Sequence, residues 1–304
     1  MSNSKLTQDA SFPASEQPTR QSALYDKVAE QTASMIIREY STSFGMAAKL
    51  LGAGVRQDVE NIYGLVRLAD EIVDGVAAYA GVDEKEIRRL LDELELETEA
   101  AMLRGYSTNL VVHAFALTAR RTGISPELTR PFFTSMRVDI TRVTHTQKSF
   151  DEYVYGSAEV VGLMCLKTFL VGKDLTPEEN DTFVTGARKL GAAFQKVNFL
   201  RDLSADVDAL GRSYFPGINI ATFTEEQKMV LVADIDSDLA ISGAIVPLLP
   251  SSSRKAVALA QNLFAELNRR IERTPAAELK HTRVSVPTLV KLRIAIAVLM
   301  GKTS

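Results

Sequence analysis

The stretch IYGLVRLADEIVDG, residues 62–75, decides how this chain folds, because it combines a helical period with closely spaced carboxylates. On a helix that advances about 100° per residue, Tyr63, Arg67, Asp70 and Asp74 fall within an arc of about 60°. Apolar side chains flank this polar stripe and continue around the far side of the helix: Ile62, Val66, Leu68, Ala69, Ile72 and Val73. A solvated face would leave apolar side chains in water on both sides of the stripe. The pattern therefore predicts a buried helix that carries buried acids.

A second polar stripe follows in FQKVNFLRDLSADVDALGRSYFP, residues 194–216. Here Gln195, Asn198, Asp202 and Asp206 fall within an arc of about 80° and are again flanked by apolar residues. Two buried acidic stripes predict cations between them, because unpaired buried carboxylates are costly. Carboxylate and amide oxygens without Cys or His suit hard ions. We therefore expect Mg²⁺, or else Mn²⁺, bound through a few carboxylates and substrate phosphates.

The histidines do not support a different metal centre. His113, His145 and His281 cannot supply the paired Glu-x-x-His ligands of a di-iron helical bundle, and we interpret all three as structural. The sequence also lacks the glycine-rich turns that bind dinucleotides or nucleotide phosphates.

Composition excludes several classes of function. The 304 residues are 46% hydrophobic and 24% charged, and the net charge of -3 gives no basic footprint for nucleic acid. The single cysteine, Cys165, excludes an internal disulfide framework and a cysteine-rich zinc site, and we interpret it as an apolar packing residue. No apolar run is long enough to span a membrane, and the N-terminus has no apolar signal core. We therefore expect a cytoplasmic protein.

The apolar period is helical almost throughout from Ser22 onward, which predicts an all-α fold of roughly ten or more helices. No linker divides the chain, and no internal repeat stands out. We expect a disordered tail over residues 1–21, rich in Ser, Gln, Thr and Pro, followed by one helical domain over residues 22–304.

Capping residues mark several helix boundaries. Helices are expected to start after Asn109, at Thr176 with Pro177 in the first helical position, and after Ser252–Ser253. Four glycines mark expected helix ends: Gly75, Gly105, Gly123 and Gly211.

The two stripes together suit one kind of substrate. Magnesium held by acidic side chains inside an apolar cavity matches a polyanionic head and an apolar body, which describes a prenyl diphosphate. The ions, with Arg67 and Arg201 on the same helices, would neutralise a leaving diphosphate as its C–O bond ionises. The apolar walls would exclude water, so that the allylic cation meets an alkene before solvent quenches it.

At these residues the chain resembles the squalene and phytoene synthase family. The blocks that carry the resemblance follow the family's usual order: YSTSF (40–44), IYGLVRLADEIVD (62–74), YVYGSAEVVGLM (153–164), QKVNFLRD (195–202) with Asp206, and GRSYFP (211–216). The paired acidic blocks in this order are far more specific than a lone Asp-x-x-x-Asp. The resemblance implies an all-α isoprenoid synthase fold around a central cavity. It also implies head-to-head condensation of two identical prenyl diphosphates through a cyclopropylcarbinyl diphosphate.

The resemblance also implies a role for individual residues. It implies that the magnesium ions lie among Asp70, Asp74, Asn198, Asp202 and Asp206. It implies contacts with diphosphate or with the first-bound prenyl chain for Ser41, Ser43, Phe44, Tyr63, Arg67, Gln195, Arg201 and Tyr214. The catalytic groups would be Arg67, Asp70, Asp74, Arg201 and Asp202. For Ser41 and Ser43, helix capping stays open as the alternative.

Two segments depart from the family pattern. Between Asp139 and Tyr153 the family commonly carries a tyrosine, whereas His145 is nearest to that place here, and a catalytic role for His145 is a hypothesis. Past Glu272 the family often has another aromatic residue, which this chain lacks. We assign no site residue in that region.

Several functions stay open. The leading hypothesis is the phytoene-forming reaction, which joins two geranylgeranyl diphosphates into a carotenoid precursor and needs no NADPH. The alternative within the family is a squalene or dehydrosqualene synthase that uses farnesyl diphosphate. A class I terpene cyclase ranks third. Its second metal-binding motif ends in Ser or Thr and then Glu, whereas this chain has Asn198, Asp202 and Asp206. The non-enzyme alternative is an inert helical lipid-binding scaffold.

The partner expected from these hypotheses is the prenyl diphosphate itself. We expect no nucleic acid and no obligate protein partner. A very apolar product favours peripheral contact with the inner face of the membrane.

Overall fold

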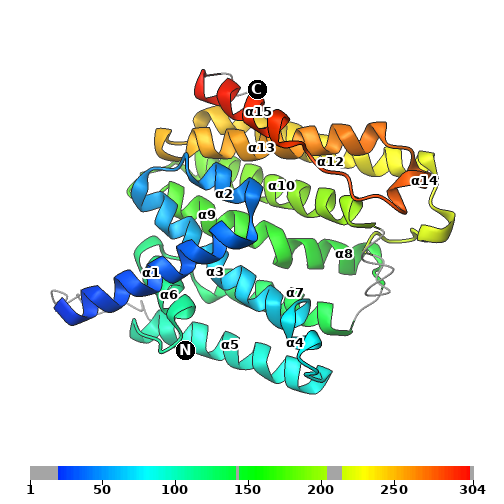
Figure 1. Cartoon of the computed structure of the whole chain (residues 1–304). Coiled ribbons are helices and arrows are strands. Elements are labelled where there is room, and N and C mark those ends of the chain that lie inside the picture. Colours follow the sequence, from blue (N-terminus) through cyan, green and yellow to red (C-terminus); the bar gives the residue numbers. More distant parts are fainter. Residues whose placement is uncertain (1–19, 142–143, 204–213, 302–304) are drawn as a thin grey trace, which may run out of the picture.

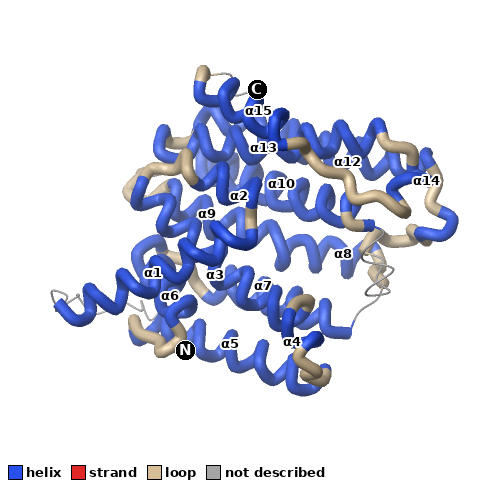
Figure 2. Tube along the Cα trace, in the orientation of Figure 1, coloured by secondary structure: helices blue, strands red, loops and turns tan. Residues whose placement is uncertain are grey.

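The computed structural model describes residues 20–141, 144–203 and 214–301. Helices joined by short connections make up nearly all of these ranges, and no β-strand occurs within them (Figure 2). The predicted all-α fold is therefore confirmed. The described elements are α1 (Arg20–Tyr40), α2 (Thr42–Ala48), α3 (Ala53–Val73), α4 (Val76–Tyr79), α5 (Glu84–Arg104), α6 (Leu110–Thr122), α7 (Pro126–Thr141), α8 (Gln147–Val154), the π-helical turn η1 (Tyr155–Glu159), α9 (Val160–Phe169), α10 (Pro177–Arg201), η2 (Ile220–Thr222), α12 (Glu225–Ile245), η3 (Val246–Leu248), α13 (Ser251–Arg273), α14 (Ala276–Leu279) and α15 (Thr288–Leu299).

Local capping chemistry sets most of the predicted helix boundaries. Thr176 and Glu179 form a reciprocal capping box at the start of α10, with Pro177 in the first helical position. The side chain of Asn109 caps α6 by accepting hydrogen bonds from two backbone N–H groups. Gly105 and Gly123 end α5 and α6 in the left-handed conformation, with φ of 79° and 73°.

Other predicted boundaries need correction or lie outside the described residues. The predicted start of α13 after Ser252–Ser253 is wrong, because Pro250 occupies the N-cap position and the helix begins at Ser251. The Pro250 carbonyl accepts the N–H groups of the first turn, so no serine cap is needed. Gly75 follows the C-cap of α3 by one residue. Gly211 and residues 1–19 of the expected tail lie outside the described ranges, and α1 begins at Arg20.

Two hydrophobic cores hold the helices that carry the acidic stripes. α3 packs with α5, α6, α7 and α9 around one core, which includes the buried Leu65 and Phe115. α10 packs with α8, α12 and α13 around a second core, which includes the buried Leu200 and Ile235. α9 packs against both α3 and α10. Figure 1 shows α5 to α7 at one end of the molecule and α12, α13 and α15 at the other, with α9 and α10 in between. The stripes are thus built on helices fixed by separate cores.

The π-helical turn η1 joins α8 directly to α9, so that the three elements form one continuous helix. Single π-helical turns inside α-helices are frequent at functional sites. Gly156 lies in the turn and faces α7 at such close range that a Cβ there would overlap the Pro131 carbonyl oxygen and Ser135 Oγ. The close approach fixes the position of η1, whose Ser157 and Ala158 line the cavity described below.

We expect Gly156→Ala to destabilise the protein, because the added methyl group must push η1 and α7 apart. Overpacking of this kind costs about 1–3 kcal/mol of unfolding free energy. Urea unfolding followed by circular dichroism would measure the change. Gly54→Ala in α3 is the matched control, since a Cβ there meets nothing within 4 Å and should stabilise the helix. Equal stability of the Gly156→Ala variant and the wild type would contradict the close packing.

Candidate active site

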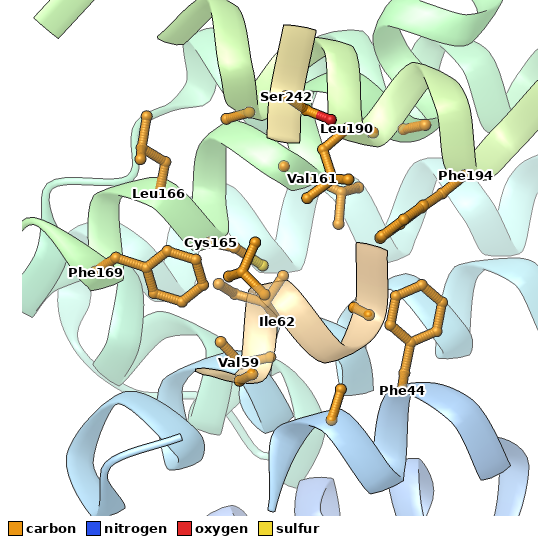
Figure 3. A pocket seen from close by; sticks show the side chains of 18 of the residues that line it. Phe44, Val59, Ile62, Val161, Cys165, Leu166, Phe169, Leu190, Phe194 and Ser242 are labelled. Carbon is orange, nitrogen blue, oxygen red and sulfur yellow. The ribbon is translucent and has the colours of Figure 1, made fainter. Parts of the chain in front are cut away.

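An apolar cavity of about 290 Å³ lies among α2, α3, α9, α10, α12 and α13. Figure 3 shows Phe44 and Phe194 on one side of this cavity and Leu166 and Phe169 on the other. Cys165 faces the cavity, and burial raises the pKa of its thiol to about 12. This agrees with an apolar role for Cys165, because the thiolate is strongly disfavoured there. The cavity can hold an elongated apolar group away from water.

Four of the sequence-predicted site residues line this cavity together. Phe44 lies with the side chains of Tyr63, Gln195 and Asn198 in the cavity wall. The last three supply a hydroxyl group and two amides to a wall that is otherwise almost entirely apolar. Tyr63 belongs to the acidic helix α3, and the two amides belong to α10. The structure therefore brings one member of the first stripe and two of the second to one cavity, whereas the described carboxylates of both stripes are not among its lining residues.

Ser41 contacts the same region through its hydroxyl group. Its Oγ accepts a hydrogen bond of 3.1 Å from the backbone N–H of Phe44, so the capping alternative for Ser41 is confirmed. Burial raises the pKa of Tyr63, while Arg67 and a hydrogen bond with Ser41 oppose that rise. Ser43 is partly buried in the first turn of α2. These contacts fix the start of α2 next to α3.

Arg67 connects the carboxylates at the end of α3. Its Nη1 donates to Asp70 Oδ2 at 2.6 Å, and its Nη2 forms an ion pair with Glu71. The guanidinium group also lies 4.4 Å from the centre of the Tyr40 ring, in a cation–π contact. Its Nε–H is buried and has no hydrogen-bond partner among the described residues. Such an unpaired donor is costly unless a ligand satisfies it.

The carboxylates beside Arg67 are less buried than the sequence predicts. The Asp70 side chain is 40% exposed, and Asp74 is exposed at the C-cap of α3. The expectation of a fully buried acidic stripe is wrong here, because the acids occupy the last turn of the helix and not its middle. Partial burial still raises the pKa of Asp70 to about 6, with Asp74 and Glu71 adding to the effect and Arg67 opposing it.

Asp202 occupies the corresponding place at the end of α10. It is the C-cap residue of that helix and forms ion pairs with Arg201 and with Arg283, whose Nε lies 2.6 Å from Asp202 Oδ1. Arg283 follows α14, in a region where the sequence predicts no site residue. Asp206, the last predicted ligand, lies outside the described residues.

Tyr214 belongs to an aromatic cluster that closes the same end of α10. Its ring stacks on Phe199 with centroids 4.0 Å apart, and the rings of Tyr153 and His145 lie 5.5 Å and 6.0 Å away. His145 thus packs between aromatic rings, and its catalytic role stays a hypothesis. His113 is structural as predicted, since it is buried and its Nε2 lies 2.8 Å from an oxygen of Asp26.

The aromatic cluster contains a buried polar pair that the sequence analysis did not assign. The Tyr153 hydroxyl group donates to Asp139 Oδ2 at 2.8 Å, and both residues are buried. Burial raises the pKa of Tyr153 well above its usual value, and the charge of Asp139 adds to the effect. The signal that could have found this pair is an aspartate on the apolar face of α7, where a partner is required.

Comparison with known proteins identifies the family. The sequence matches the squalene/phytoene synthase family over residues 37–290. This chain belongs to the squalene/phytoene synthase family. Among curated family members, it is 30% identical to a 15-cis-phytoene synthase from Paracoccus sp. over 190 residues, which are 61% of this chain and 59% of that protein. It is 28% identical to a phytoene synthase from Arthrospira platensis over 240 residues, which are 76% of this chain and 73% of that protein. The matched regions thus span less than two thirds of the Paracoccus protein.

Solved structures of the squalene/phytoene synthase family have the same fold. A dehydrosqualene synthase in complex with a ligand superposes with a TM-score of 0.74 at 23% identity, covering 92% of this chain and 98% of that one. Squalene synthase HpnC from Alicyclobacillus acidocaldarius superposes with a TM-score of 0.70 at 18% identity, covering 82% and 95%. At these identities the likeness shows the fold alone. The predicted all-α isoprenoid synthase fold is confirmed.

The described residues fit a hard divalent cation. The available donors are carboxylate and amide oxygens, which are the ligands that Mg²⁺ prefers. Burial is the main cause of the raised pKa of Asp70, and a cation would favour the charged form of this carboxylate, as Arg67 partly does. Among the described residues, no three His, Cys, Asp or Glu side chains converge closely enough to hold an ion by themselves. A Mg²⁺ ion held here would need water and substrate phosphates to complete its coordination.

Proposed function

We propose that this chain is a phytoene synthase that condenses two geranylgeranyl diphosphates head to head in carotenoid biosynthesis. The observation that carries the proposal is the apolar cavity, because a hydroxyl group and two amides in its wall lie on the two helices that end in carboxylates, α3 and α10. Tyr63 lies two turns before Asp70 on α3, and Asn198 lies one turn before Asp202 on α10. The names of the curated relatives support the choice of substrate.

In this proposal the acidic residues hold the diphosphate groups through divalent cations. Mg²⁺, or Mn²⁺ in its place, would be held by Asp70, Asp74, Asn198, Asp202 and Asp206. When bound, it supplies positive charge that stabilises the leaving diphosphate.

The arginines and the apolar wall would carry the remaining steps. The unpaired Nε–H of Arg67 donates to a diphosphate oxygen, and Arg201 adds positive charge from α10. As the C–O bond breaks, diphosphate leaves with the bonding electrons, and the allylic cation lies against side chains that cannot quench it. The double bond of the second substrate attacks this cation, and loss of a proton gives prephytoene diphosphate, a cyclopropylcarbinyl diphosphate. A second ionisation, rearrangement and loss of a proton yield the hydrocarbon and a second diphosphate.

Product chromatography with each substrate separately tests the proposal. We expect geranylgeranyl diphosphate to give a hydrocarbon of twice its carbon number and two diphosphates, with far lower turnover of farnesyl diphosphate. Preferential conversion of farnesyl diphosphate would instead identify a squalene or dehydrosqualene synthase. Release of no diphosphate from either substrate would leave the lipid-binding scaffold as the explanation.

A further inference from the structure

Helix α15 exposes a continuous apolar stripe. Leu289, Leu292, Ile296, Leu299 and Met300 are 80%, 53%, 48%, 51% and 70% exposed. On a helix these five positions fall within an arc of about 100°. Single exposed apolar residues are ordinary, but five on one face mark an interaction surface. Among the described helices, none is long and apolar enough to cross a membrane, so α15 is not a spanning segment.

The charged residues of the segment that forms this stripe are all basic. Residues 284–301 contain Lys291 and Arg293 and no acidic residue, although the whole chain has a net charge of -3. Arg293 is exposed beside the stripe and has no ion-pair partner among the described residues. Lys291 donates to Thr42 Oγ1 at 3.2 Å at the opposite edge of the helix. An apolar helix face whose own segment carries basic and no acidic residues is complementary to a bilayer with anionic headgroups.

The inner face of α15 packs against the wall of the apolar cavity. Val298 is buried in one cluster with Ala47, Val246 and Ala260, and these three residues also line the cavity. Ile294 and Ala295 pack against the same cluster. The inner face of α15 and the cavity therefore share one hydrophobic cluster. In Figure 1, α15 lies at the opposite end of the molecule from α5.

We propose that α15 docks this protein on a bilayer with anionic headgroups, lying in the plane of the interface with its apolar stripe among the acyl chains. The consequence rests on the proposed function: docking places the cavity next to the lipid phase, where apolar substrates and products partition. A helix of twelve residues with one apolar face suits such in-plane binding. The stripe and Arg293 would supply the apolar and electrostatic parts of the affinity.

Tryptophan fluorescence can report the docking directly, because the chain contains no tryptophan. Leu292→Trp places a single tryptophan in the stripe. Leu96→Trp is the matched control, since Leu96 is 69% exposed on the acidic helix α5. With vesicles of phosphatidylcholine and phosphatidylglycerol, emission of Leu292→Trp should move to shorter wavelength and that of Leu96→Trp should not. Added salt should reverse much of the change, because it screens the attraction between Arg293 and the headgroups.

Vesicle flotation of charge variants gives the second test. Leu292→Glu/Ile296→Glu should lower the fraction bound to these vesicles at least about tenfold. Leu96→Glu/Leu103→Glu, which changes two residues 69% and 71% exposed on α5, should bind as the wild type does. Diphosphate release in detergent should be unchanged in both variants, so loss of docking is distinguishable from failure of the proposed function. The proposal would be overturned if the wild type did not float with the vesicles, or if both double variants lost vesicle binding equally. It would also be overturned if the wild type were a dimer and only the α15 variant were a monomer.

Discussion

Replacing Asp70 by asparagine should lower the rate of diphosphate release at least about a hundredfold, because the variant keeps the shape of the side chain and loses the charge that serves ion binding. The fold should survive, since Asp70 is partly exposed and Arg67 keeps its ion pair with Glu71. Steady-state assays with saturating prenyl diphosphate over a range of Mg²⁺ concentrations would measure the effect, and circular dichroism would check the fold. Asp202→Asn should cause a loss of similar size.

Glu93→Gln is the matched control for the change at Asp70. Glu93 pairs with Arg89 at the same spacing as Glu71 with Arg67, but the pair is exposed on α5. Exposed ion pairs of this kind contribute little, so Glu93→Gln should leave turnover unchanged. If Asp70→Asn or Asp202→Asn kept near wild-type turnover at limiting Mg²⁺, the assignment of that residue as a metal ligand would be wrong.

The sequence predicted the helices well where the determining interactions are local. The capping box at Thr176 and the left-handed glycines Gly105 and Gly123 act within one helical turn, so their spacing in the chain is enough to place a helix end. The start of α13 was predicted too late, because serine is a good N-cap and Pro250 competes for the same role. The N-cap propensities of neighbouring residues do not by themselves decide where a helix begins to within one or two positions.

The candidate site shows a different limit of sequence reasoning. The helical period grouped Asp70 with Tyr63 on α3 and Asp202 with Asn198 on α10, and the structure places Tyr63 and Asn198 in the cavity wall. The period could not tell that both acids lie at helix ends, where water reaches them. The helical period determines on which side of a helix a residue lies, whereas tertiary packing determines how deeply its side chain is buried. Arg283 forms its ion pair with Asp202 although 81 residues separate the two in the sequence, and no local sequence pattern predicts such a long-range contact.

The cavity itself depends on contacts that spacing does not reveal. Gly162 lets α9 approach α10 closely, because a Cβ there would come within 2.6 Å of the Ala187 carbonyl oxygen. Gly191 lets α10 approach η1 in the same way, because a Cβ there would come within 2.6 Å of the Ala158 carbonyl oxygen. Both glycines line the cavity. The apolar residues that flank both polar stripes predicted an apolar cavity. The close contacts of α10 with α9 and η1 set the packing of its wall.

The reaction with geranylgeranyl diphosphate should require no reduced nicotinamide. The sequence shows no glycine-rich dinucleotide turn, and in the proposed phytoene synthase reaction the rearranged cation is neutralised by loss of a proton. Loss of that proton leaves a central double bond, and hence a conjugated triene that absorbs in the near ultraviolet. A squalene synthase would instead quench the cation with hydride, and the triene would be absent.

Incubation of the enzyme with Mg²⁺ and geranylgeranyl diphosphate, with and without NADPH, measures this difference. The expected result is the same amount of triene hydrocarbon in both reactions, read by chromatography with absorbance detection. The Asp70→Asn variant is the control, because any hydrocarbon that it forms at the wild-type rate would not come from catalysis at the proposed site. If hydrocarbon formed only with NADPH, or if the triene disappeared when NADPH was added, the proposed assignment as a phytoene synthase would be wrong. The enzyme would then be a reductive synthase. The two outcomes differ in the fate of one cation: a proton leaves it in the first case, and a hydride adds to it in the second.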